Sequence, residues 1–175
     1  MIFQEPVLLR WKDVTRNVLF PIEILRQDTR KYQEKAHEIL DLVGLKGFEH
    51  RHPAELSGGM QQRVAMARAL VHDPRLLLMD EPFGALDQLT RQQMNLELLR
   101  IWMETNKTTV LVTHDIEEAV FLADKVVVMT PRPGRVADEV DIELPRPREL
   151  NMKMSSEFGE LVMRVGELIG LDYGR

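Results

Sequence analysis

The sequence predicts an α/β fold built around a parallel β-sheet. Three short apolar runs, "RLLLMD", "TTVLVT" and "KVVVM", are separated by two helical segments, "DQLTRQQMNLELLRIWMETN" and "DIEEAVFLAD". Alternation of strand and helix along a chain is typical of a parallel sheet with right-handed crossovers. Because the runs are continuously apolar, we expect the first two strands to be buried on both faces.

The composition limits the class of protein. A net charge of -5 gives no overall attraction for nucleic acid, and no local basic patch stands out. Cysteine is absent, which excludes disulfides and Cys-ligated metal sites. No apolar run reaches the roughly 18 residues needed to cross a bilayer, and the start "MIFQEPVLLR" does not resemble a signal peptide. We therefore expect a cytoplasmic protein whose membrane association depends on a partner.

The N-terminal part is predicted to be mostly helical. "MIF" is a short β-favouring piece at the very start. The apolar residues of 28–43 fall on one face of a helix, with Asp28 as its N-cap and Gly44 as its stop. Ser57 is placed to cap a further helix that runs to about Val71.

The C-terminal part continues the alternation of helix and strand. Asp87 opens a long helix, and Asp115 with Glu118 three residues later forms a start like a capping box. "VADEVDIEL" is expected to be an edge strand, and the proline-rich "LPRPREL" a linker. The last segment has an apolar stripe at helical spacing, which predicts an amphipathic helix that docks on another element. The stripe comprises Phe158, Leu161, Val162, Val165, Leu168 and Ile169.

Candidate chemical groups follow the predicted strands. In an open α/β sheet, ligands gather at the carboxyl ends of the strands, where Asp80, Glu81 and His114 are expected. Asp80 can hold Mg²⁺ while Glu81 polarises an attacking water. The alternative is that "DEP" merely ends its strand in a solvated turn.

A second candidate is the turn at Ser57, Gly58 and Gly59, directly before a helix. A helix start offers backbone N–H groups and a partial positive charge, so it can hold an anion. The chain nevertheless has no match to the lysine-bearing phosphate loop G-x-x-x-x-G-K-[ST]. The residues alone leave open which molecule carries the phosphate that this turn would hold.

The ordered set "FQEP", "LSGGMQQR", "LLLMDEP", "GALD" and "LVTHD" closely resembles the nucleotide-binding subunit of ATP-binding cassette transporters, over essentially the whole chain. The resemblance implies a P-loop NTPase-like (RecA-like) parallel sheet core with an inserted helical subdomain, an ATPase activity, and ATP and Mg²⁺ as cofactors. It implies these roles: Gln4 as the Q-loop glutamine that senses Mg²⁺ and the attacking water, Ser57, Gly58, Gly59 and Gln61 as the signature motif, Asp80 as the Walker B aspartate, Glu81 as the catalytic glutamate, Asp87 as the D-loop aspartate and His114 as the switch histidine.

In that family two subunits pack head to tail, and each signature turn closes over the ATP held by the other subunit. The family's phosphate loop and its adenine-stacking aromatic residue lie upstream of the Q-loop glutamine, and this sequence begins three residues before Gln4. We therefore expect an N-terminally truncated domain that is inactive alone. Its partners would be a second copy or another such subunit, transmembrane permease subunits and, indirectly, a solute-binding protein, with the subunit peripheral on the inner face of the cell membrane.

The resemblance divides the chain into 1–145, a partial nucleotide-binding domain, and 146–175, a linker with an amphipathic helix. Within the domain, about 10–72 would be the helical subdomain and 73–145 the α/β core. The segment after Gln4 would receive a permease helix, with Leu8, Leu9 and Trp11 as apolar anchors and Arg10 at the rim. Packing of these side chains inside the domain is the alternative.

The motifs are most similar to importers of the nitrate, sulfonate and taurine group, although that group often has proline where Arg10 stands. One alternative is a DNA-repair or chromosome-organising ATPase, but Gln4 and Ser57 are only 53 positions apart and no sustained heptads occur between them. Another is a non-catalytic module that lends its signature turn to a complete partner. For Arg63 and Arg68, on the signature helix, the default expectation is salt bridges within the helical subdomain.

Overall fold

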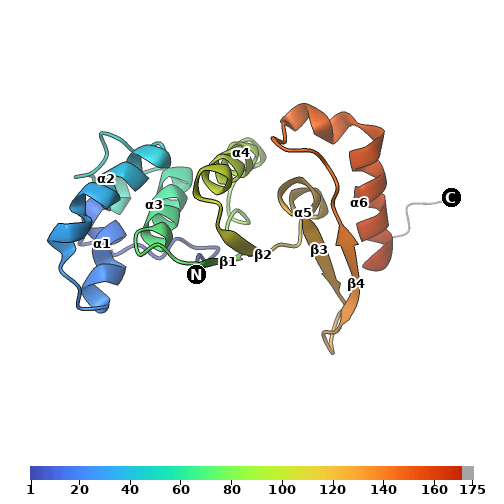
Figure 1. Cartoon of the computed structure of the whole chain (residues 1–175), viewed down its shortest axis with the longest axis horizontal. Helices are drawn as coiled ribbons and strands as arrows, with labels where there is room; N and C mark the ends of the chain where they lie inside the picture. The colour runs from blue at the N-terminus through green and yellow to red at the C-terminus, as the bar shows by residue number, and fades with distance from the viewer. Residues whose placement is uncertain (171–175) are drawn as a thin grey trace. The chain divides into compact units, whose positions relative to one another are not determined.

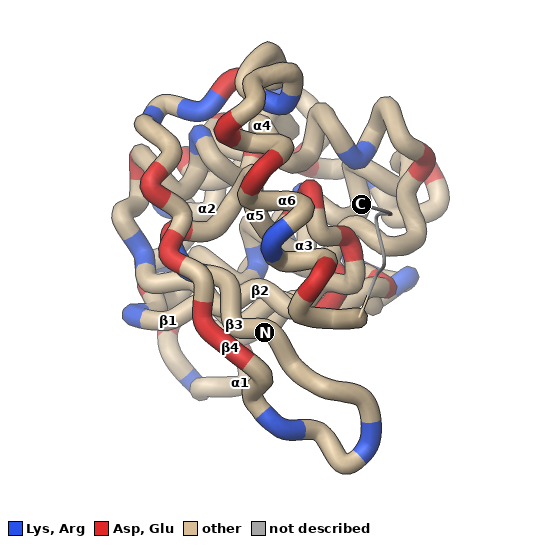
Figure 2. Tube along the Cα trace, turned by 90° about the vertical axis from the view of Figure 1, so that its right-hand side faces the viewer, with Lys and Arg blue, Asp and Glu red and all other residues tan. Residues whose placement is uncertain are grey.

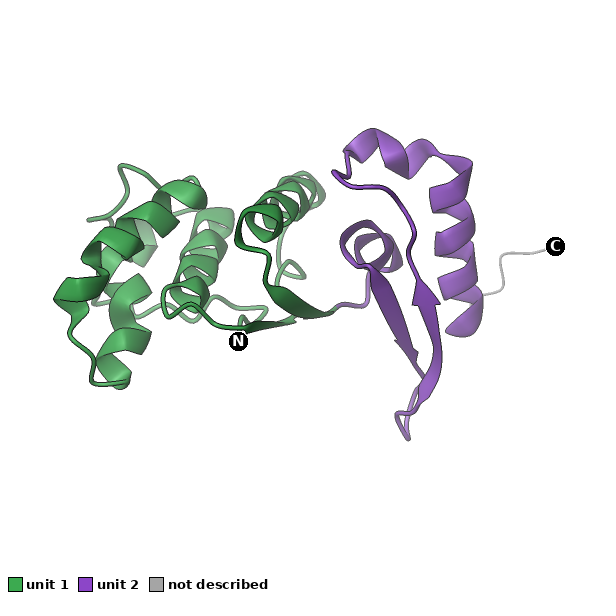
Figure 3. Ribbon diagram, in the orientation of Figure 1, with its two compact units in different colours: residues 1–112 green, residues 113–175 purple. Residues whose placement is uncertain are grey.

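A computed structural model describes residues 1–170, which form two compact units, residues 1–112 and residues from 113 onward (Figure 3). The predicted helices and strands are present, and the last five residues of the predicted C-terminal segment lie outside the described residues. The first unit contains α1 (Val14–Ile24), the 3₁₀ turn η1 (Thr29–Tyr32), α2 (Gln33–Leu42), η2 (Pro53–Glu55), α3 (Gly58–Leu70), β1 (Leu76–Asp80), α4 (Gln88–Thr105) and β2 (Thr108–Val112) (Figure 1).

The N-terminal helices of the first unit pack on one another, with α1 against both α2 and α3. Val18, Ile22, Leu40 and Val64 are fully buried within this group. Burial of such side chains contributes roughly 1.5–3 kcal/mol each to folding. The expected helix over 28–43 begins instead as η1, because the Asp28 side chain accepts from the Arg30 amide and tightens the first turn before α2.

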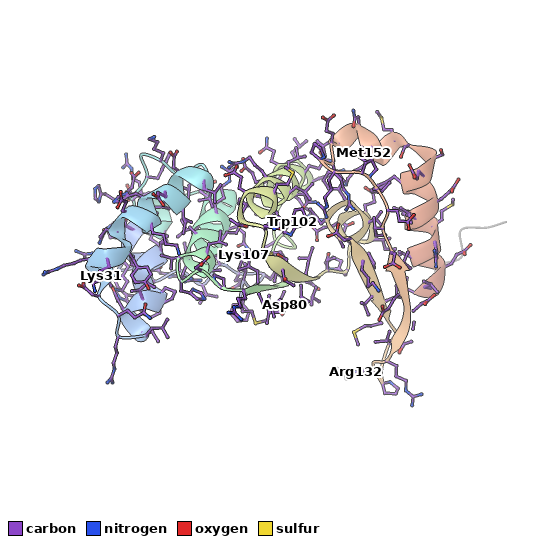
Figure 4. All side chains as sticks on the ribbon, viewed as in Figure 1. Lys31, Asp80, Trp102, Lys107, Arg132 and Met152 are labelled. Carbon is purple, nitrogen blue, oxygen red and sulfur yellow. The ribbon has the colours of Figure 1, made fainter. Side chains whose placement is uncertain are left out.

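β1 and β2 pair in parallel, from Leu76 opposite Thr108 to Asp80 opposite Val112. The "MIF" segment pairs with the other edge of β1 through a bridge between Ile2 and Met79. The "MIF" segment, β1 and β2 therefore run in the same direction, and their carboxyl ends lie at one edge of the sheet. At the opposite end of β1 and β2, where the strands begin, the Lys107 ammonium lies 2.7 Å from the Asp73 carboxylate (Figure 4).

The expected burial of these strands on both faces is wrong. Leu77 and Met79 are buried, but Leu76 and Leu78 on the opposite face of β1 are 46% and 40% exposed. On β2, Val110 is 49% exposed. Figure 1 shows α4 on one side of the two strands, so successive side chains, which point to opposite faces of a strand, are not buried equally.

The second unit contains α5 (Ile116–Leu122), β3 (Lys125–Met129), β4 (Val136–Asp141), η3 (Leu150–Met154) and α6 (Ser156–Leu168). The prediction that "KVVVM" continues the parallel sheet is wrong, because the turn at 130–135 returns the chain directly and β3 pairs antiparallel with β4. β4 is the expected edge strand, and Figure 2 shows its acidic residues. Of these, Glu139 pairs with Lys125 at 2.9 Å.

The predicted amphipathic helix is α6, which packs on α5, β3 and β4 and buries Phe158 and Val165. The expectation that "LPRPREL" is a linker is wrong. Arg148 in this segment is only 4% exposed, and its guanidinium donates to the carbonyls of Ala123 at 2.7 Å and Phe121 at 3.1 Å. These carbonyls lie at the end of α5, where a helix has no internal donors for them, so the arginine fixes the segment in the second unit.

Candidate functional site

Gln4 and Asp80 lie at the same end of the first unit's sheet. Ile2 donates its N–H to the carbonyl of Leu78 at 2.8 Å, and Asp80 donates its N–H to the carbonyl of Ile2 at 2.9 Å. Gln4 follows this pairing by two residues, and Asp80 is the last residue of β1 (Figure 4). Both side chains are exposed at this edge. Asp80 therefore lies at the predicted rim, and the structure places Gln4 there as well.

Glu81 begins a tight turn at the end of β1. Its N–H donates to the carbonyl of Val112 at 2.8 Å, and its carbonyl accepts from the N–H of Gly84 at 3.1 Å. Its φ is +43°, a left-handed conformation that few residues other than glycine adopt. Such strain persists only where surrounding structure fixes it, and it concentrates at functional sites. Glu81 is therefore half-buried at the rim in a strained backbone conformation. It does not lie in a relaxed, fully solvated turn.

Gln4 and Glu81 converge on Gly84. A Cβ at Gly84 would lie 3.0 Å from Gln4 Nε2 and 3.3 Å from a carboxylate oxygen of Glu81. The absence of a side chain at this glycine therefore leaves the space in which an amide and a carboxylate come together. The two groups can act on the same small ligand, such as a water molecule.

The signature turn is open to solvent. Ser57 and Gly58 are exposed and Gly59 is half-buried, and the Ser57 hydroxyl oxygen accepts from the N–H of Met60 at 3.3 Å. Since Ser57 is the N-cap of α3, the N–H groups of Gly58 and Gly59 have no carbonyl one turn earlier in the helix to bind. The start of α3 therefore has exposed N–H groups of the kind that can hold an anion, and anion binding there stays a prediction.

Gln61 serves the local structure of this turn. Its Nε2 donates to the carbonyls of Pro53 at 3.0 Å and Leu56 at 3.2 Å. The side-chain oxygen that remains is an acceptor and cannot donate to a phosphate. For this reason we do not include Gln61 among the proposed nucleotide contacts.

Asp87 is connected to the signature turn through Thr90. Asp87 is the N-cap of α4, and the Thr90 hydroxyl donates to its carboxylate at 2.6 Å. These hydrogen bonds from Thr90 lower the pKa of Asp87 below its ordinary value of 3.8. The methyl carbon of Thr90 lies 3.0 Å from where a Cβ at Gly59 would be, so the absence of a side chain at Gly59 admits this close contact.

His114 belongs to the second unit and is exposed. The backbone that follows it is fixed locally, because Asp115 donates its N–H to the Thr113 hydroxyl at 3.0 Å and caps α5 through the N–H of Glu118, also at 3.0 Å. The predicted role of His114 toward a γ-phosphate stays a prediction.

Asp80 and Gln4 provide oxygen atoms at the rim, which is the donor type that Mg²⁺ prefers. Among residues 1–170, no three or more His, Asp or Glu side chains gather into a group that could hold a metal. Mg²⁺ commonly keeps only one or two carboxylate ligands and completes its coordination with phosphate oxygens and water. The residues present therefore fit a Mg²⁺ ion that arrives with a nucleotide.

Arg68 and Gln62 were not predicted as part of the site. The salt-bridge prediction is wrong for Arg68, whose guanidinium donates to the backbone carbonyls of Pro6 and Val7. Arg63 does form a salt bridge, at 3.8 Å, but its partner is Glu97 on α4, outside the predicted helical subdomain of about 10–72. Hydrogen bonds to backbone carbonyls leave no trace in the residue types along a sequence, whereas the position of Thr90 three residues after an N-cap aspartate could have been noticed.

No helix within residues 1–170 has the length and apolar character required to cross a membrane.

Comparison with known proteins gives a consistent result. A profile of the ABC transporter family matches residues 1–84. An uncharacterized ABC transporter ATP-binding protein of Methanocaldococcus jannaschii is 48% identical over 91% of this chain and 59% of its own length. The taurine import ATP-binding protein TauB of Pseudomonas fluorescens is 50% identical over 82% of this chain and 54% of its own length.

Among solved structures, cbiO1 of Clostridium perfringens, part of the ABC transporter complex cbiONQ, is similar to this chain with a TM-score of 0.73 and 25% identity. That match covers 95% of this chain and 65% of cbiO1. The chain spans somewhat more than half the length of the two curated relatives.

Proposed function

Because this chain belongs to the ATP-binding cassette (ABC) transporter family, we propose that it forms one face of a composite ATP site in an ATP-driven importer. The observation that carries the proposal is the exposed, Ser57-capped start of α3 in a sequence without a lysine-bearing phosphate loop. The phosphate loop of the composite site then comes from another polypeptide or from residues outside this sequence. Ser57, Gly58 and Gly59 contact the γ-phosphate of the ATP bound there.

Hydrolysis of the second ATP of a head-to-tail dimer, the one covered by the signature turn of the other subunit, is assigned to the rim of this chain's sheet. Glu81 accepts a proton from the attacking water, and Gln4 orients that water from its place beside Gly84. Asp80 and Gln4 would hold Mg²⁺, and the ion would supply neutralisation of negative charge on the phosphates. Asp87 lies between the Glu81 turn and α4. For His114, a role toward a γ-phosphate is supported by the family resemblance alone. The convergence of Gln4 and Glu81 on Gly84 supports the assignment of hydrolysis to this rim.

The composite site is tested by ATP-dependent association. The purified chain is mixed with a complete homologous subunit that contains the phosphate loop, and complex formation is followed by analytical ultracentrifugation as MgATP is added. We expect a heterodimer only in the presence of MgATP. No association at any MgATP concentration would contradict the proposal.

A substitution at the signature turn makes this test specific. Gly58→Asp places a carboxylate where the γ-phosphate would bind, and like charges there oppose each other, so we expect association to be lost. A Cβ at Gly58 meets only Leu86 at 3.6 Å, so the fold can accept the side chain. Gly159→Asp is the matched control, because Gly159 lies near the start of α6 with open space around its Cβ position.

Catalysis is tested with Glu81→Gln in the chain extended upstream by a phosphate loop. Loss of a general base lowers turnover by about 10²- to 10⁴-fold, while nucleotide-dependent association persists. The readout is the turnover of the extended chain itself, because the ATP that faces Glu81 is the one held by the phosphate loop of the same subunit. Unchanged turnover would remove Glu81 from this role.

The transported solute is proposed from the relatives. The similarity to taurine import ATP-binding proteins supports an importer for nitrate, sulfonate or taurine-like solutes. Selection of the solute would lie in the permease and a solute-binding protein. The subunit would then be cytoplasmic and held at the inner face of the cell membrane by the permease.

The proposed permease contact is the segment after Gln4. Trp11 is 73% exposed, Leu8 and Leu9 are half-buried, and Arg10 is exposed. The loop is held rigidly by the buried Asn17, which accepts from the Leu9 N–H at 2.8 Å and donates to the Leu9 carbonyl at 3.1 Å. A large exposed aromatic side chain on a rigid support is suited to act as an anchor for a partner.

Two alternatives predict different behaviour. A non-catalytic module would show the ATP-dependent association but no effect of Glu81→Gln on turnover. A DNA-repair or chromosome-organising ATPase would bind DNA, whereas the net charge of -5 and the short helices α1 and α2 between Gln4 and Ser57 favour the transporter class.

A further inference from the structure

The signature helix α3 holds the segment around Gln4 through hydrogen bonds to the backbone. Gln62, which is 2% exposed, donates its side-chain N–H to the carbonyl of Phe3 at 3.2 Å. Arg68 donates Nη2 to the carbonyl of Pro6 at 2.7 Å and Nη1 to the carbonyl of Val7 at 3.0 Å. Backbone positions on both sides of Gln4 are therefore fixed from a single helix.

Val7 has an unusual backbone conformation at the centre of this contact. Its φ is +41°, a left-handed value that is rare for a β-branched residue and is normally unfavourable. The side chain is 63% exposed, so packing of the side chain does not explain the conformation. Strain of this kind persists only when neighbouring groups enforce it.

Arg68 is placed to enforce it. In extended chain, consecutive carbonyls point to opposite sides, so one guanidinium cannot bind both. Rotation about the N–Cα bond of Val7 changes the orientation of the Pro6 carbonyl relative to the Val7 carbonyl. With the left-handed φ, both carbonyls accept from the planar fork of one arginine. Burial lowers the pKa of Arg68, and at neutral pH the side chain is still charged.

The bend determines where Gln4 reaches. The Phe3 carbonyl is held by Gln62 before Gln4, and the Pro6 carbonyl is held by Arg68 after it. Between these two points the Gln4 amide extends to Gly84, next to Glu81. Without the hydrogen bond from Arg68 to the Pro6 carbonyl, the chain from Glu5 onward would straighten. The Gln4 amide would then withdraw from Gly84.

We propose that Arg68 is a positioning residue that holds the left-handed bend at Val7 and thereby keeps the Gln4 amide against Gly84 and Glu81. It acts through Gln4 and makes no contact with nucleotide itself. Its importance for hydrolysis rests on the proposed function, whereas the positioning of Gln4 is a property of the chain alone. The same arginine connects the anion-binding helix α3 to the loop that carries Gln4.

The positioning is tested by NMR on the 175-residue chain without nucleotide. The readout is the NOE between the side-chain amide protons of Gln4 and the α-protons of Gly84. We expect Arg68→Met to abolish this NOE and Arg68→Lys to weaken it, because an ammonium group cannot form the fork. Arg63→Met is the matched control on the same helix, since Arg63 pairs with Glu97, and it should leave the NOE intact.

A rescue separates positioning from general stabilisation of the fold. Glycine adopts a left-handed φ without the penalty of a Cβ, so Arg68→Met combined with Val7→Gly should recover part of the NOE. Arg68→Met combined with Leu8→Gly adds the same flexibility one residue later and should recover none. Equal recovery in the two double variants, or none in either, would overturn the proposal.

Val7→Pro tests the bend even if Arg68→Met does not fold. Proline fixes φ near -65° at an exposed position, so the bend cannot form although Arg68 is intact. We expect loss of the Gln4 NOE in a chain that still melts cooperatively. Retention of the NOE in Val7→Pro, or in a folded Arg68→Met variant, would overturn the proposal.

The consequence for hydrolysis is measured separately. In the chain extended upstream by a phosphate loop, Arg68→Met should lower kcat and leave KM unchanged, because the phosphate loop and not the Gln4 segment binds the ATP. Failure of the MgATP-dependent complex to form would contradict the proposed function, while the NMR result on the isolated chain would still decide the role of Arg68.

Discussion

Gln4 Nε2 and a carboxylate oxygen of Glu81 lie within 3.0 Å and 3.3 Å of the point where a Cβ would stand at Gly84. The two groups come from segments far apart in the sequence, and the pairing of Ile2 with β1 brings them to the same rim. The positions of the Gln4 amide and the Glu81 carboxylate are thus set by the paired strands. A site that holds a reacting atom in place requires such a rigid support.

Gly84→Ala is expected to displace Gln4 with little loss of stability. The added methyl contacts the end of an exposed, flexible side chain, so the free energy of unfolding should change by less than about 1 kcal/mol. The Gln4 side-chain amide resonances should shift, as measured in ¹⁵N-edited spectra. Gly159→Ala, at a position with nothing within 4 Å of its Cβ, is the control. Unchanged Gln4 resonances in Gly84→Ala would contradict the convergence.

The contact between Gly59 and Thr90 predicts a double-mutant effect. Alanine is favoured over glycine in a helix by about 1 kcal/mol, but a Cβ at Gly59 would lie 3.0 Å from the Thr90 methyl, and such overpacking costs about 1–3 kcal/mol. We expect Gly59→Ala to lower the free energy of unfolding in urea. Thr90→Ser removes the methyl and keeps the hydroxyl, so Gly59→Ala should become neutral or stabilising in the Thr90→Ser background. Additive effects would show that the two residues are not in contact.

Asp87 is expected to titrate below its ordinary pKa because the Thr90 hydroxyl and N–H donate to it. Since the folded pKa is lower than the unfolded value near 3.8, the ionised carboxylate stabilises the fold above that value. This contribution is lost as the pH falls through the folded pKa. NMR titration of Thr90→Val should show the pKa of Asp87 moving upward. Thr105→Val removes a hydroxyl that donates to the Ile101 carbonyl on the same helix. This control should leave the pKa of Asp87 unchanged.

Arg148 is expected to be required for the stability of the second unit. Besides the carbonyls at the end of α5, it reaches those of Ile142 and Leu144, and each buried group left without a partner costs about 1–3 kcal/mol. Arg148→Met should therefore destabilise the second unit by at least about 3 kcal/mol, measured by hydrogen exchange of α5 and β3 amides. The burial of Arg148 and the nearby charge of Arg146 lower its pKa to about 10, so the arginine is charged at neutral pH.

Arg146→Met is the comparison for Arg148. Arg146 pairs with the exposed Asp124 at 2.7 Å, and surface ion pairs of this kind contribute about 0–1 kcal/mol. It also donates to the carbonyl of Leu122, so a modest loss is expected. If Arg146→Met and Arg148→Met lost hydrogen-exchange protection equally, the buried contacts of Arg148 would not be what fixes the "LPRPREL" segment.

Local signals in the sequence were sufficient to predict where the main helices begin. Ser57, Asp87 and Asp115 cap the helices that follow them, because an N-cap needs only a short polar side chain directly before a helical run. The amphipathic stripe around Phe158 and Val165 predicted α6 for a similar reason. These features depend on residues within one or two turns of each other.

The same reasoning was insufficient wherever distant segments meet. An apolar run gives no information on whether both faces of its strand are covered, so the exposure of Leu76, Leu78 and Val110 was missed. The direction in which β3 pairs depended on the turn at 130–135. The role of Arg148 was missed because the acceptors are carbonyls, which every residue has.

By itself, the sequence determined which residues could do chemistry and in what order they occur, since motif spacing, caps and apolar periodicity are properties of neighbouring residues. Only the tertiary structure decided that Gln4 and Glu81 share the space at Gly84, that Thr90 connects Asp87 to Gly59, and that Arg68 holds the bend at Val7. These relationships depend on distances of a few ångströms between segments that packing and backbone hydrogen bonds bring together. Other sequences with the same pattern of motifs and apolar residues would not necessarily produce them.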